Sequence, residues 1–197
     1  MTEQRAIRAL YDKDCITVYQ AYSAEIAEAA VREQKLSASP AFRLDRMTWI
    51  KPSWCWMMYR SGYSYKDERQ ARILAIRIRH ENFYTILRHA RLADRPKKDG
   101  EKAGDSVIVQ WDPERSPGIA KLEYRSLQVG IPRHLAEKYV EDWIESIEDA
   151  TDIARKLKSR LDGSRDVSRE DLEQEGVVPL ELPYEVPDDV RERLEMG

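Results

Sequence analysis

Residues 46–62, RMTWIKPSWCWMMYRSG, carry the residue types that could grip a planar, anionic ligand. Three of the chain's five tryptophans lie in this stretch, together with Arg46, Lys51 and Arg60. Aromatic rings can stack on a planar group, and lysine or arginine can bind phosphate oxygens. The alternative is a core helix with a basic rim, because Trp54, Met57 and Met58 also fit one buried helical face.

Lys51 is a strong candidate in this stretch because it precedes Pro52, a residue favoured in the first turn of a helix. A helix N-terminus at this place would attract anions. Trp56 and Arg60 are four residues apart, so they could instead form an ordinary cation–π pair on the same helix.

Elements on both sides must position this segment. CITVYQAY (15–22) predicts a strand, and Ser23 is a suitable N-cap for the helix AEIAEAAVREQKL. RMTWIK (46–51) predicts a second strand, followed by a short helix WCWMMYRS that ends at Gly62.

The remainder of the chain mixes both kinds of element. Strands are predicted at 72–78, 107–111 and 122–131, a helix at 81–92 and a polar loop at 95–105. The strand at 107–111 should stop at Asp112-Pro113. Pro132 should open one long helix that continues to about Leu161, on an apolar stripe at helical spacing.

The mixture without a strict βαβ rhythm predicts an α+β fold: a compact, curved or split β-sheet core with flanking helices and a long helix near the C-terminus. Residues 1–161 are expected to form a single domain. Residues 162–197 are acidic and contain three prolines in VVPLELPYEVPDD. We expect this segment to be an extended arm or partly disordered.

Composition excludes several classes of protein. The chain of 197 residues has no run of about 18 apolar residues, and MTEQRAIRALYDKD lacks the apolar stretch of a signal peptide. We therefore expect a cytoplasmic protein that does not enter membranes, with Cys15 and Cys55 as buried, reduced thiols. A reactive Cys55 is the alternative.

Charge is unevenly distributed along the chain. Residues 43–98 contain 14 Lys and Arg against 5 Asp and Glu, whereas residues 134–197 contain 9 against 19. The basic segment could meet the phosphates of a nucleic acid. The two segments could also attract each other within the fold, and composition alone favours this second interpretation.

Several catalytic signatures are missing. The sequence has no Walker loop, no GxGxxG and no GxSxG, and its three histidines are isolated from one another. No Cys/His cluster has zinc spacing, so no metal site is expected.

Five segments resemble the signature of the domain of unknown function 4291 family. They are IRALYD (7–12), TVYQAYSAEIAEAAV (17–31), RMTWIKPSWCWMMYRSGY (46–63), QWDPER (110–115) and YRSLQVGI (124–131). The resemblance covers most of residues 5–150, and the family name carries no activity with it.

A second resemblance suggests an activity. TVYQAYSAEIAEAAVREQKL is similar to the first motif of ADP-ribosyltransferases, in which a strand presents a polar residue to the NAD ribose and a helix follows at once. Gln20 holds the place of the usual His or Arg. A late strand supplies a catalytic Glu in that superfamily. The candidates here are Gln128 and, less well placed, Glu123.

This second resemblance implies NAD as substrate and assigns roles to further residues. Arginine forks suit the pyrophosphate, and Arg8, Arg46, Arg60 and Arg125 are the candidates. Side chains expected to bind NAD are Arg8, Tyr11, Tyr22, Lys51, Trp54, Tyr59, Arg60 and Arg125. Gln20 could instead bond only to neighbouring backbone, Asp112 could merely cap a turn, and Arg125 could face a buried acid rather than a phosphate.

Three functions are compatible with these features. The first is an ADP-ribosyltransferase-like protein that binds NAD and transfers ADP-ribose to a nucleic acid or protein acceptor. The alternative is a non-enzymatic nucleic-acid-binding module, with tryptophans stacked on bases. A third is a partner-binding protein that uses the acidic C-terminal arm.

Overall fold

The computed structural model describes residues 4–96, 100, 105–163 and 167–197. These residues form an α+β fold, so the predicted fold class is confirmed. The polar loop expected at 95–105 lies largely outside the described residues. Within the described ranges, no helix is long and apolar enough to cross a membrane.

The alternating run RILAIRI forms β4 (Arg72–Arg79), the central strand of a three-stranded antiparallel sheet. Its neighbours are β2 (Cys15–Tyr22) and β8 (Ile144–Asp149). Ile76 and Ile78 are fully buried on one face, whereas Ala75 and Arg77 on the other face are partly exposed. This alternation is the period-2 pattern of a strand with one face in the core.

A second sheet has four strands in the order β3 (Thr48–Ile50), β7 (Lys121–Ile131), β6 (Val107–Arg115) and β5 (Ala90–Leu92). β5 and β6 are parallel, and the other pairs are antiparallel. The sequence predicted that this strand would stop at Asp112-Pro113, but β6 continues to Arg115. The strand can include Pro113 because the register shifts there, where a missing backbone N–H is tolerated. The helix predicted at 81–92 ends earlier, since its last residues form β5.

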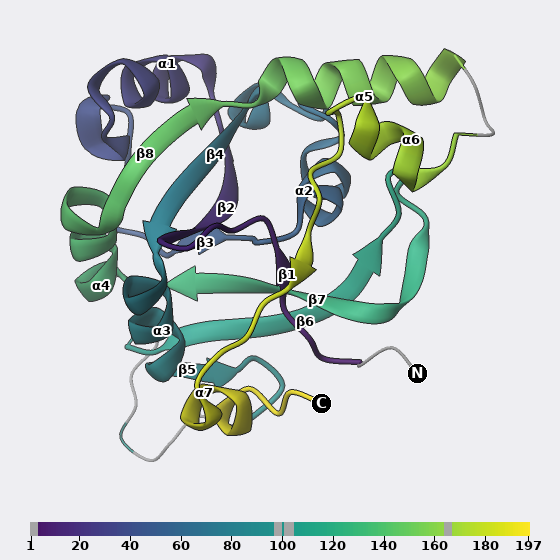
Figure 1. Ribbon diagram of the computed structural model, residues 1–197. Coiled ribbons are helices and arrows are strands. Elements are labelled where there is room, and N and C mark those ends of the chain that lie inside the picture. Colours follow the sequence, from purple (N-terminus) through teal and green to yellow (C-terminus); the bar gives the residue numbers. More distant parts are fainter. Residues whose placement is uncertain (1–3, 97–99, 101–104, 164–166) are drawn as a thin grey trace.

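The two sheets meet at one point. Tyr19 N–H donates to the Lys51 carbonyl at 2.7 Å, and Lys51 N–H donates to the Tyr19 carbonyl at 3.2 Å. The pairing does not continue beyond this bridge, so β2 and the start of β3 separate. The sheet core is therefore split into two sheets, and β3 and α2 of the segment 46–62 lie next to β2 (Figure 1).

Helices cover the sheets on the outside (Figure 1). α1 (Ala24–Glu33) follows β2 directly after Ser23, the predicted N-cap residue, although the Ser23 side chain makes no capping bond. α2 (Trp54–Ser61) ends at Gly62, whose φ of 58° is the left-handed conformation that glycine tolerates. α3 (His80–Arg88) follows β4.

The single long helix expected from Pro132 to Leu161 is wrong. The structure has α4 (Arg133–Lys138), a π-helical turn at Tyr139–Trp143, β8, and then α5 (Thr151–Gly163). The apolar spacing misled because the register shifts between Arg77 and Ile78, so that Ile144 and Ile147, three residues apart, pair with Ile78 and Ile76 on one strand face. β4 offers an open edge to this segment, and its pairing with β8 satisfies backbone groups that a helix would have satisfied internally.

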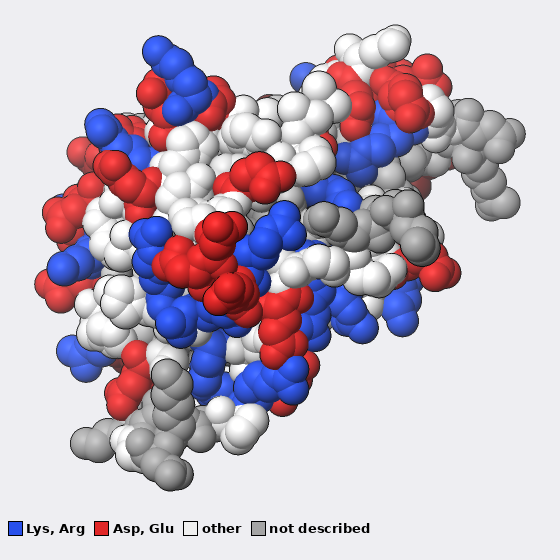
Figure 2. All heavy atoms as spheres, turned by 60° about the horizontal axis from the view of Figure 1, so that its bottom comes forward, with Lys and Arg blue, Asp and Glu red and all other residues white. Residues whose placement is uncertain are grey.

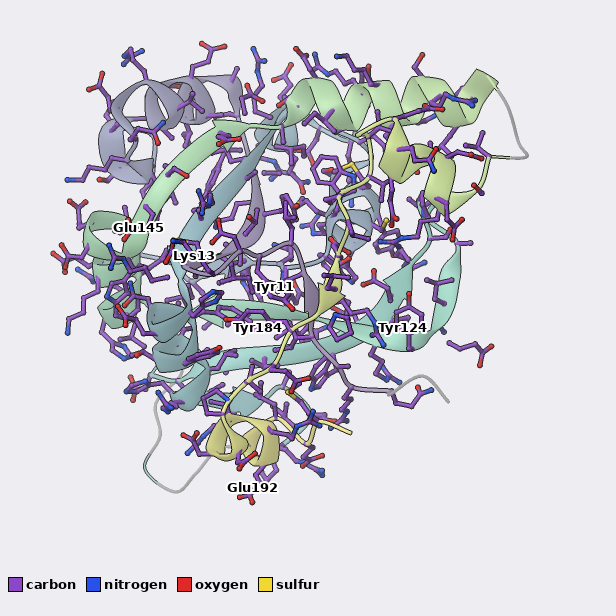
Figure 3. All side chains as sticks on the ribbon, in the orientation of Figure 1. Tyr11, Lys13, Tyr124, Glu145, Tyr184 and Glu192 are labelled. Carbon is purple, nitrogen blue, oxygen red and sulfur yellow. The ribbon has the colours of Figure 1, made fainter. Side chains whose placement is uncertain are left out.

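The C-terminal segment runs as an extended arm between two short helices, α6 (Arg169–Gln174) and α7 (Asp188–Arg193). It crosses in front of β7 and β6, and β9 (Leu182–Pro183) pairs there with β1 (Arg8–Ala9) (Figure 1). Tyr184 packs edge-on against Tyr11 with ring centroids 5.2 Å apart, and both are labelled in Figure 3. Several apolar side chains of the arm are buried: Leu172, Val177, Val178, Tyr184, Val190 and Leu194. The described part of the arm thus completes the core.

The basic and acidic segments of the sequence pair with each other. Arg79 bonds Glu145 at 2.6 Å, and further pairs of this kind are Arg72–Asp149, Arg88–Asp189 and Arg95–Glu195. Figure 2 shows basic and acidic side chains interleaved on the face it presents. Much of the positive charge in residues 43–98 is therefore neutralised within the fold.

Candidate functional site

A pocket of about 450 Å³ opens where β2 and β3 separate. The end of β2 forms one wall, β3 and the segment before it form the second, and α2 with residues 69–70 forms the third. The side chains used below are Gln20, Tyr22, Phe42, Arg43, Arg46, Trp49, Lys51, Arg60 and Arg69. The pocket exists because β2 and β3 do not pair here, so no backbone fills the space between them.

The pocket is lined by positive charge. Five lining residues are cationic, namely Arg43, Arg46, Lys51, Arg60 and Arg69, and no Asp or Glu lines it among the described residues. Asp45 neutralises Arg43, and Asp67 lies 3.4 Å from Arg69. The other three cations have no carboxylate within 4 Å in the described part of the chain. An anionic ligand would be attracted to such a site.

Lys51 is the buried member of these three unpaired cations. Its side chain is 7% exposed, and its Nζ donates to the Trp49 carbonyl at 3.2 Å. The pKa of Lys51 is lowered to about 7, chiefly by burial and also by the nearby Arg60 guanidinium, while the Asp112 carboxylate acts in the opposite direction. A buried ammonium without a counter-ion is costly, so a bound phosphate would restore its charge.

Aromatic side chains form the other part of the pocket wall. The rings of Tyr22 and Phe42 lie 5.8 Å apart, at the mouth formed by β2 and the segment before β3. Trp49 lies flat against β7 at Gly130, where a Cβ atom would come within 2.9 Å of the indole. The missing side chain of Gly130 therefore makes room for Trp49, which can stack on a planar group.

Gln20 lies at the base of the pocket, 3% exposed, and its amide is fully used by the protein. Its Nε2 donates to the Trp49 carbonyl at 3.1 Å and to the Tyr22 hydroxyl at 3.0 Å. Its Oε1 accepts from the Tyr139 hydroxyl at 2.9 Å. Gln20 thus replaces the missing backbone pairing across the split through the Trp49 carbonyl. It also bonds the hydroxyls of Tyr22 and Tyr139, so it does more than the backbone bonding that was the alternative interpretation.

Gln128 lies on β7, one residue before Val129, which pairs with Ile50 of β3. Lys51 leaves this ladder and pairs with Tyr19 of β2 instead, and Gln128 does not line the pocket. Gln128 Nε2 donates to Asp112 Oδ2 at 2.9 Å, and Gln110 Nε2 donates to Asp112 Oδ1 at 2.8 Å. Asp112 therefore does not cap a turn. It lies within the ladder of β6, opposite Ser126.

Three predicted site residues lie near α2 or the arm but outside the pocket. Trp54 is 2% exposed, and its Nε1 donates to the Val177 carbonyl of the arm at 3.2 Å. Tyr59 is exposed, and the guanidinium of Arg115 covers its ring at 3.7 Å. The Tyr11 hydroxyl donates to the Pro183 carbonyl, which anchors β9.

Three more of the predicted site residues lie around the four-stranded sheet, away from the pocket. Arg8 stacks on the Tyr124 ring at 4.3 Å. Arg125 is on the opposite face of β7 from Gln128, and its Nη1 donates to the Trp111 carbonyl at 3.1 Å. Glu123 is exposed two residues away. Of the residues expected to bind NAD, the structure therefore brings together Tyr22, Lys51 and Arg60, with Arg46 beside them.

The N-terminus of α2 is not free for an anion. Pro52 precedes the N-cap instead of opening the helix, and the Ser53 hydroxyl accepts from Trp56 N–H. Glu181 of the arm accepts from Trp54 N–H at 2.5 Å. Any phosphate bound here would therefore depend on side chains and not on the helix terminus.

Sequence reasoning missed Phe42, Arg69 and the wall formed by Trp49. The strand period offered a signal for Trp49, since it is two residues from Lys51 and so shares its face. Phe42 and Arg69 lie outside regular strands, and no sequence signal places them here. Within the described residues, no group of three or more His, Cys, Asp or Glu side chains is arranged to hold a metal ion.

The pocket thus combines unpaired cations with aromatic walls, which suits an anion that carries a planar ring. The family model for the domain of unknown function 4291 matches residues 6–184 of this chain. The chain belongs to this family. No protein of curated function matches the sequence. The matched region extends well into the C-terminal arm, in keeping with the arm's buried contacts.

Proposed function

We propose that this protein binds NAD in the basic pocket and is an ADP-ribosyltransferase-like protein, with a nucleic acid or a protein as acceptor of ADP-ribose. The observation that carries the proposal is the group of unpaired cations, Arg46, Lys51 and Arg60, beside the rings of Tyr22, Phe42 and Trp49. A pyrophosphate carries two negative charges that such a group can bind, and the rings offer stacking surfaces for a base.

The place of the pocket also supports NAD. Gln20 lies on the strand that directly precedes α1, the layout that led us to expect a ribose-binding strand. In this pocket Gln20 orients Tyr22 through the hydrogen bond to the hydroxyl. Tyr22 and Trp49 therefore form a wall of fixed geometry, which favours binding because little side-chain freedom is lost.

Removing the charge of Lys51 tests the proposal. In Lys51→Met we expect the dissociation constant for ADP-ribose to rise about tenfold to a hundredfold, since hydrogen bonds to charged groups are worth about 1.5–3 kcal/mol. The melting temperature should not fall, because the variant no longer buries an ammonium. Isothermal titration calorimetry measures the affinity, and thermal unfolding measures the stability.

Lys138→Met is the matched control, since Lys138 is exposed on α4 and does not line the pocket. It makes the same change of charge and should bind ADP-ribose as the wild type does. Equal affinity of Lys51→Met and wild type would refute the assignment of this pocket to a phosphate.

The alternative is a nucleic-acid-binding module, in which the same cations would bind the phosphates of a nucleic acid and NAD would have no part. The ion pairs between the basic and acidic segments weigh against a long phosphate-binding track. The two functions differ in salt response, because binding to many phosphates weakens steeply as salt rises.

A further inference from the structure

A second pocket, of about 500 Å³, lies between the three-stranded sheet and the C-terminal arm, and the proposed function does not use it. Its floor is the face of the sheet opposite Ile76 and Ile78. The arm forms one wall between α6 and β9, and the start of α5 and the segment before β2 form others (Figure 1). We call this space the arm pocket. Its volume lies within the range of about 300–1,000 Å³ that is usual for small-molecule sites.

Apolar side chains gather around the arm pocket. The described residues leave eight large apolar side chains exposed, and four of these line the pocket: Leu10, Tyr11, Ile153 and Leu180. The rings of Tyr19 and Trp54, both buried, lie at its floor. Exposed apolar surface that is concentrated around a cavity in this way marks a binding site for an apolar group.

The hydroxyl of Thr17 is free to bond a ligand in the arm pocket. Thr17 is 7% exposed and lines the pocket, and its side chain makes no hydrogen bond within the part of the chain that the structure describes. A hydroxyl that leaves water without gaining a partner costs free energy, so buried hydroxyls are usually bonded. A polar group of a ligand would supply the partner that the fold does not.

The arm pocket also has one carboxylate that the fold leaves unpaired. Three of the carboxylates that line it are paired with arginines: Asp12 with Arg77, Asp149 with Arg72 and Glu173 with Arg169. Glu148 lines the pocket as well, at its exposed mouth, and no Lys, Arg or His among the described residues lies within 4 Å of its carboxylate. One negative charge thus remains, and it favours a ligand with a cationic group.

Thr17 and Glu148 lie on one face of the sheet. Tyr19 pairs with Ala75, and Ala75 pairs with Glu148, so these three residues form one row across β2, β4 and β8. Thr17 lies two residues before Tyr19 and therefore shares its face. Two strands and two residues separate the backbones of Thr17 and Glu148, which is about 12 Å at standard sheet spacing. The two side chains shorten this gap to the length of a small molecule.

We propose that the arm pocket binds a small organic ammonium ion whose aromatic body carries a hydroxyl group at its far end. The ammonium pairs with Glu148 at the mouth, and the hydroxyl bonds to Thr17 at the floor. The ring packs between the sheet and Leu180 of the arm. A cavity enclosed by sheet and arm suits a small molecule and not an extended protein surface. The inference is independent of NAD, because these three residues do not line the basic pocket.

Three related probes test the charge and the hydroxyl separately. They are tyramine, phenethylamine, which lacks the hydroxyl, and para-hydroxyphenylpropionate, which has a carboxylate in place of the ammonium. Titration of isotope-labelled protein, followed by nuclear magnetic resonance, measures each dissociation constant. We expect wild type to bind tyramine about threefold to tenfold more tightly than phenethylamine, the usual value of one neutral hydrogen bond. The propionate should bind most weakly.

Variants of the lining residues locate the site. Thr17→Val keeps the shape of the side chain, so it should bind tyramine and phenethylamine equally, with no fall in melting temperature. Glu148→Gln should weaken both amines about twofold to fivefold, as for an exposed ion pair. Glu137→Gln, an exposed change on α4 outside the pocket, is its control and should bind as wild type does. Ala75→Leu fills the floor and should abolish binding of both amines.

The contrary results are equally specific. Absence of saturable binding by all three probes overturns the proposal, and equal binding of tyramine and the propionate overturns the choice of a cation. Tyramine binding that is unchanged in folded Ala75→Leu places the ligand elsewhere. A preference for tyramine that persists in Thr17→Val overturns the role of the hydroxyl. None of these results bears on the proposed function, which NAD and ADP-ribose binding to the basic pocket tests.

Discussion

Replacing Trp54 with alanine is expected to lower the free energy of unfolding by about 3–5 kcal/mol, the usual cost of removing a large buried side chain. Trp54 is 2% exposed and packs edge-on against Tyr19 with ring centroids 5.1 Å apart. Its indole N–H also donates to the Val177 carbonyl, so the change leaves a buried carbonyl of the arm without its partner. Chemical denaturation followed by fluorescence or circular dichroism measures the loss.

Tyr65→Ala is the control for this prediction. Tyr65 is 64% exposed, so its removal should cost less than about 1 kcal/mol. The folded fraction of Trp54→Ala should still bind ADP-ribose, because Trp54 does not line the basic pocket. Full stability with lost binding would instead place Trp54 in the site.

Replacing Glu181 with glutamine is expected to remove a large pH dependence of stability. The pKa of Glu181 is raised from its ordinary 4.5 to about 8, chiefly by burial and next by the neighbouring carboxylate of Glu114. Between these two pH values the native protein binds a proton that the unfolded chain has released. The free energy of unfolding therefore falls as pH rises from about 4.5 to about 8.

The expected gain follows from this shift. One pKa unit corresponds to about 1.4 kcal/mol, so Glu181→Gln should be more stable than wild type by about 2–4 kcal/mol at pH 8.5, and similar to it near pH 5. Glutamine keeps an oxygen that can accept from Trp54 N–H. Because the pKa of Lys51 is lowered to about 7, Lys51 makes the free energy of unfolding rise with pH above 7. This contribution is the same in wild type and Glu181→Gln, so it cancels when the two proteins are compared.

Denaturation at pH 5, 7 and 8.5 tests this prediction. Glu185→Gln is the control, because it makes the same substitution on the same arm at a side chain that is 82% exposed. Parallel curves for wild type and Glu181→Gln would show that the buried carboxylate does not titrate as its surroundings imply.

The sequence predicted most of the sheet-forming segments because their patterns have a local cause. RILAIRI alternates with a period of two, and Ser23 and Gly62 stand at the helix ends that their residue types favour. The failure at residues 132–161 has a cause that is not local. Ile144 and Ile147 fit either element, and the choice depends on the open edge of β4, about 70 residues earlier in the sequence.

The sequence predicted only those residues of the candidate site that lie close together within one segment of the chain. Lys51 and Arg60 lie in the unusual stretch 46–62, and Tyr22 ends the strand that contains Gln20. Trp54, from the same stretch, is core, because the C-terminal arm covers it through Val177 and Glu181. The contact between Asp112 and Gln128 depends on the register of β6 with β7, which a pattern of single residues cannot reveal.

Calorimetric titration of the wild-type protein with NAD and ADP-ribose, at two salt concentrations and at pH 6.5 and 8.5, tests the central claim most directly. We predict saturable binding of both ligands that persists at the higher salt. At pH 8.5 binding should take up protons from the buffer, because a phosphate beside Lys51 raises its pKa from about 7. Absence of binding by both ligands under all four conditions would contradict the claim, and the basic pocket would then need another ligand.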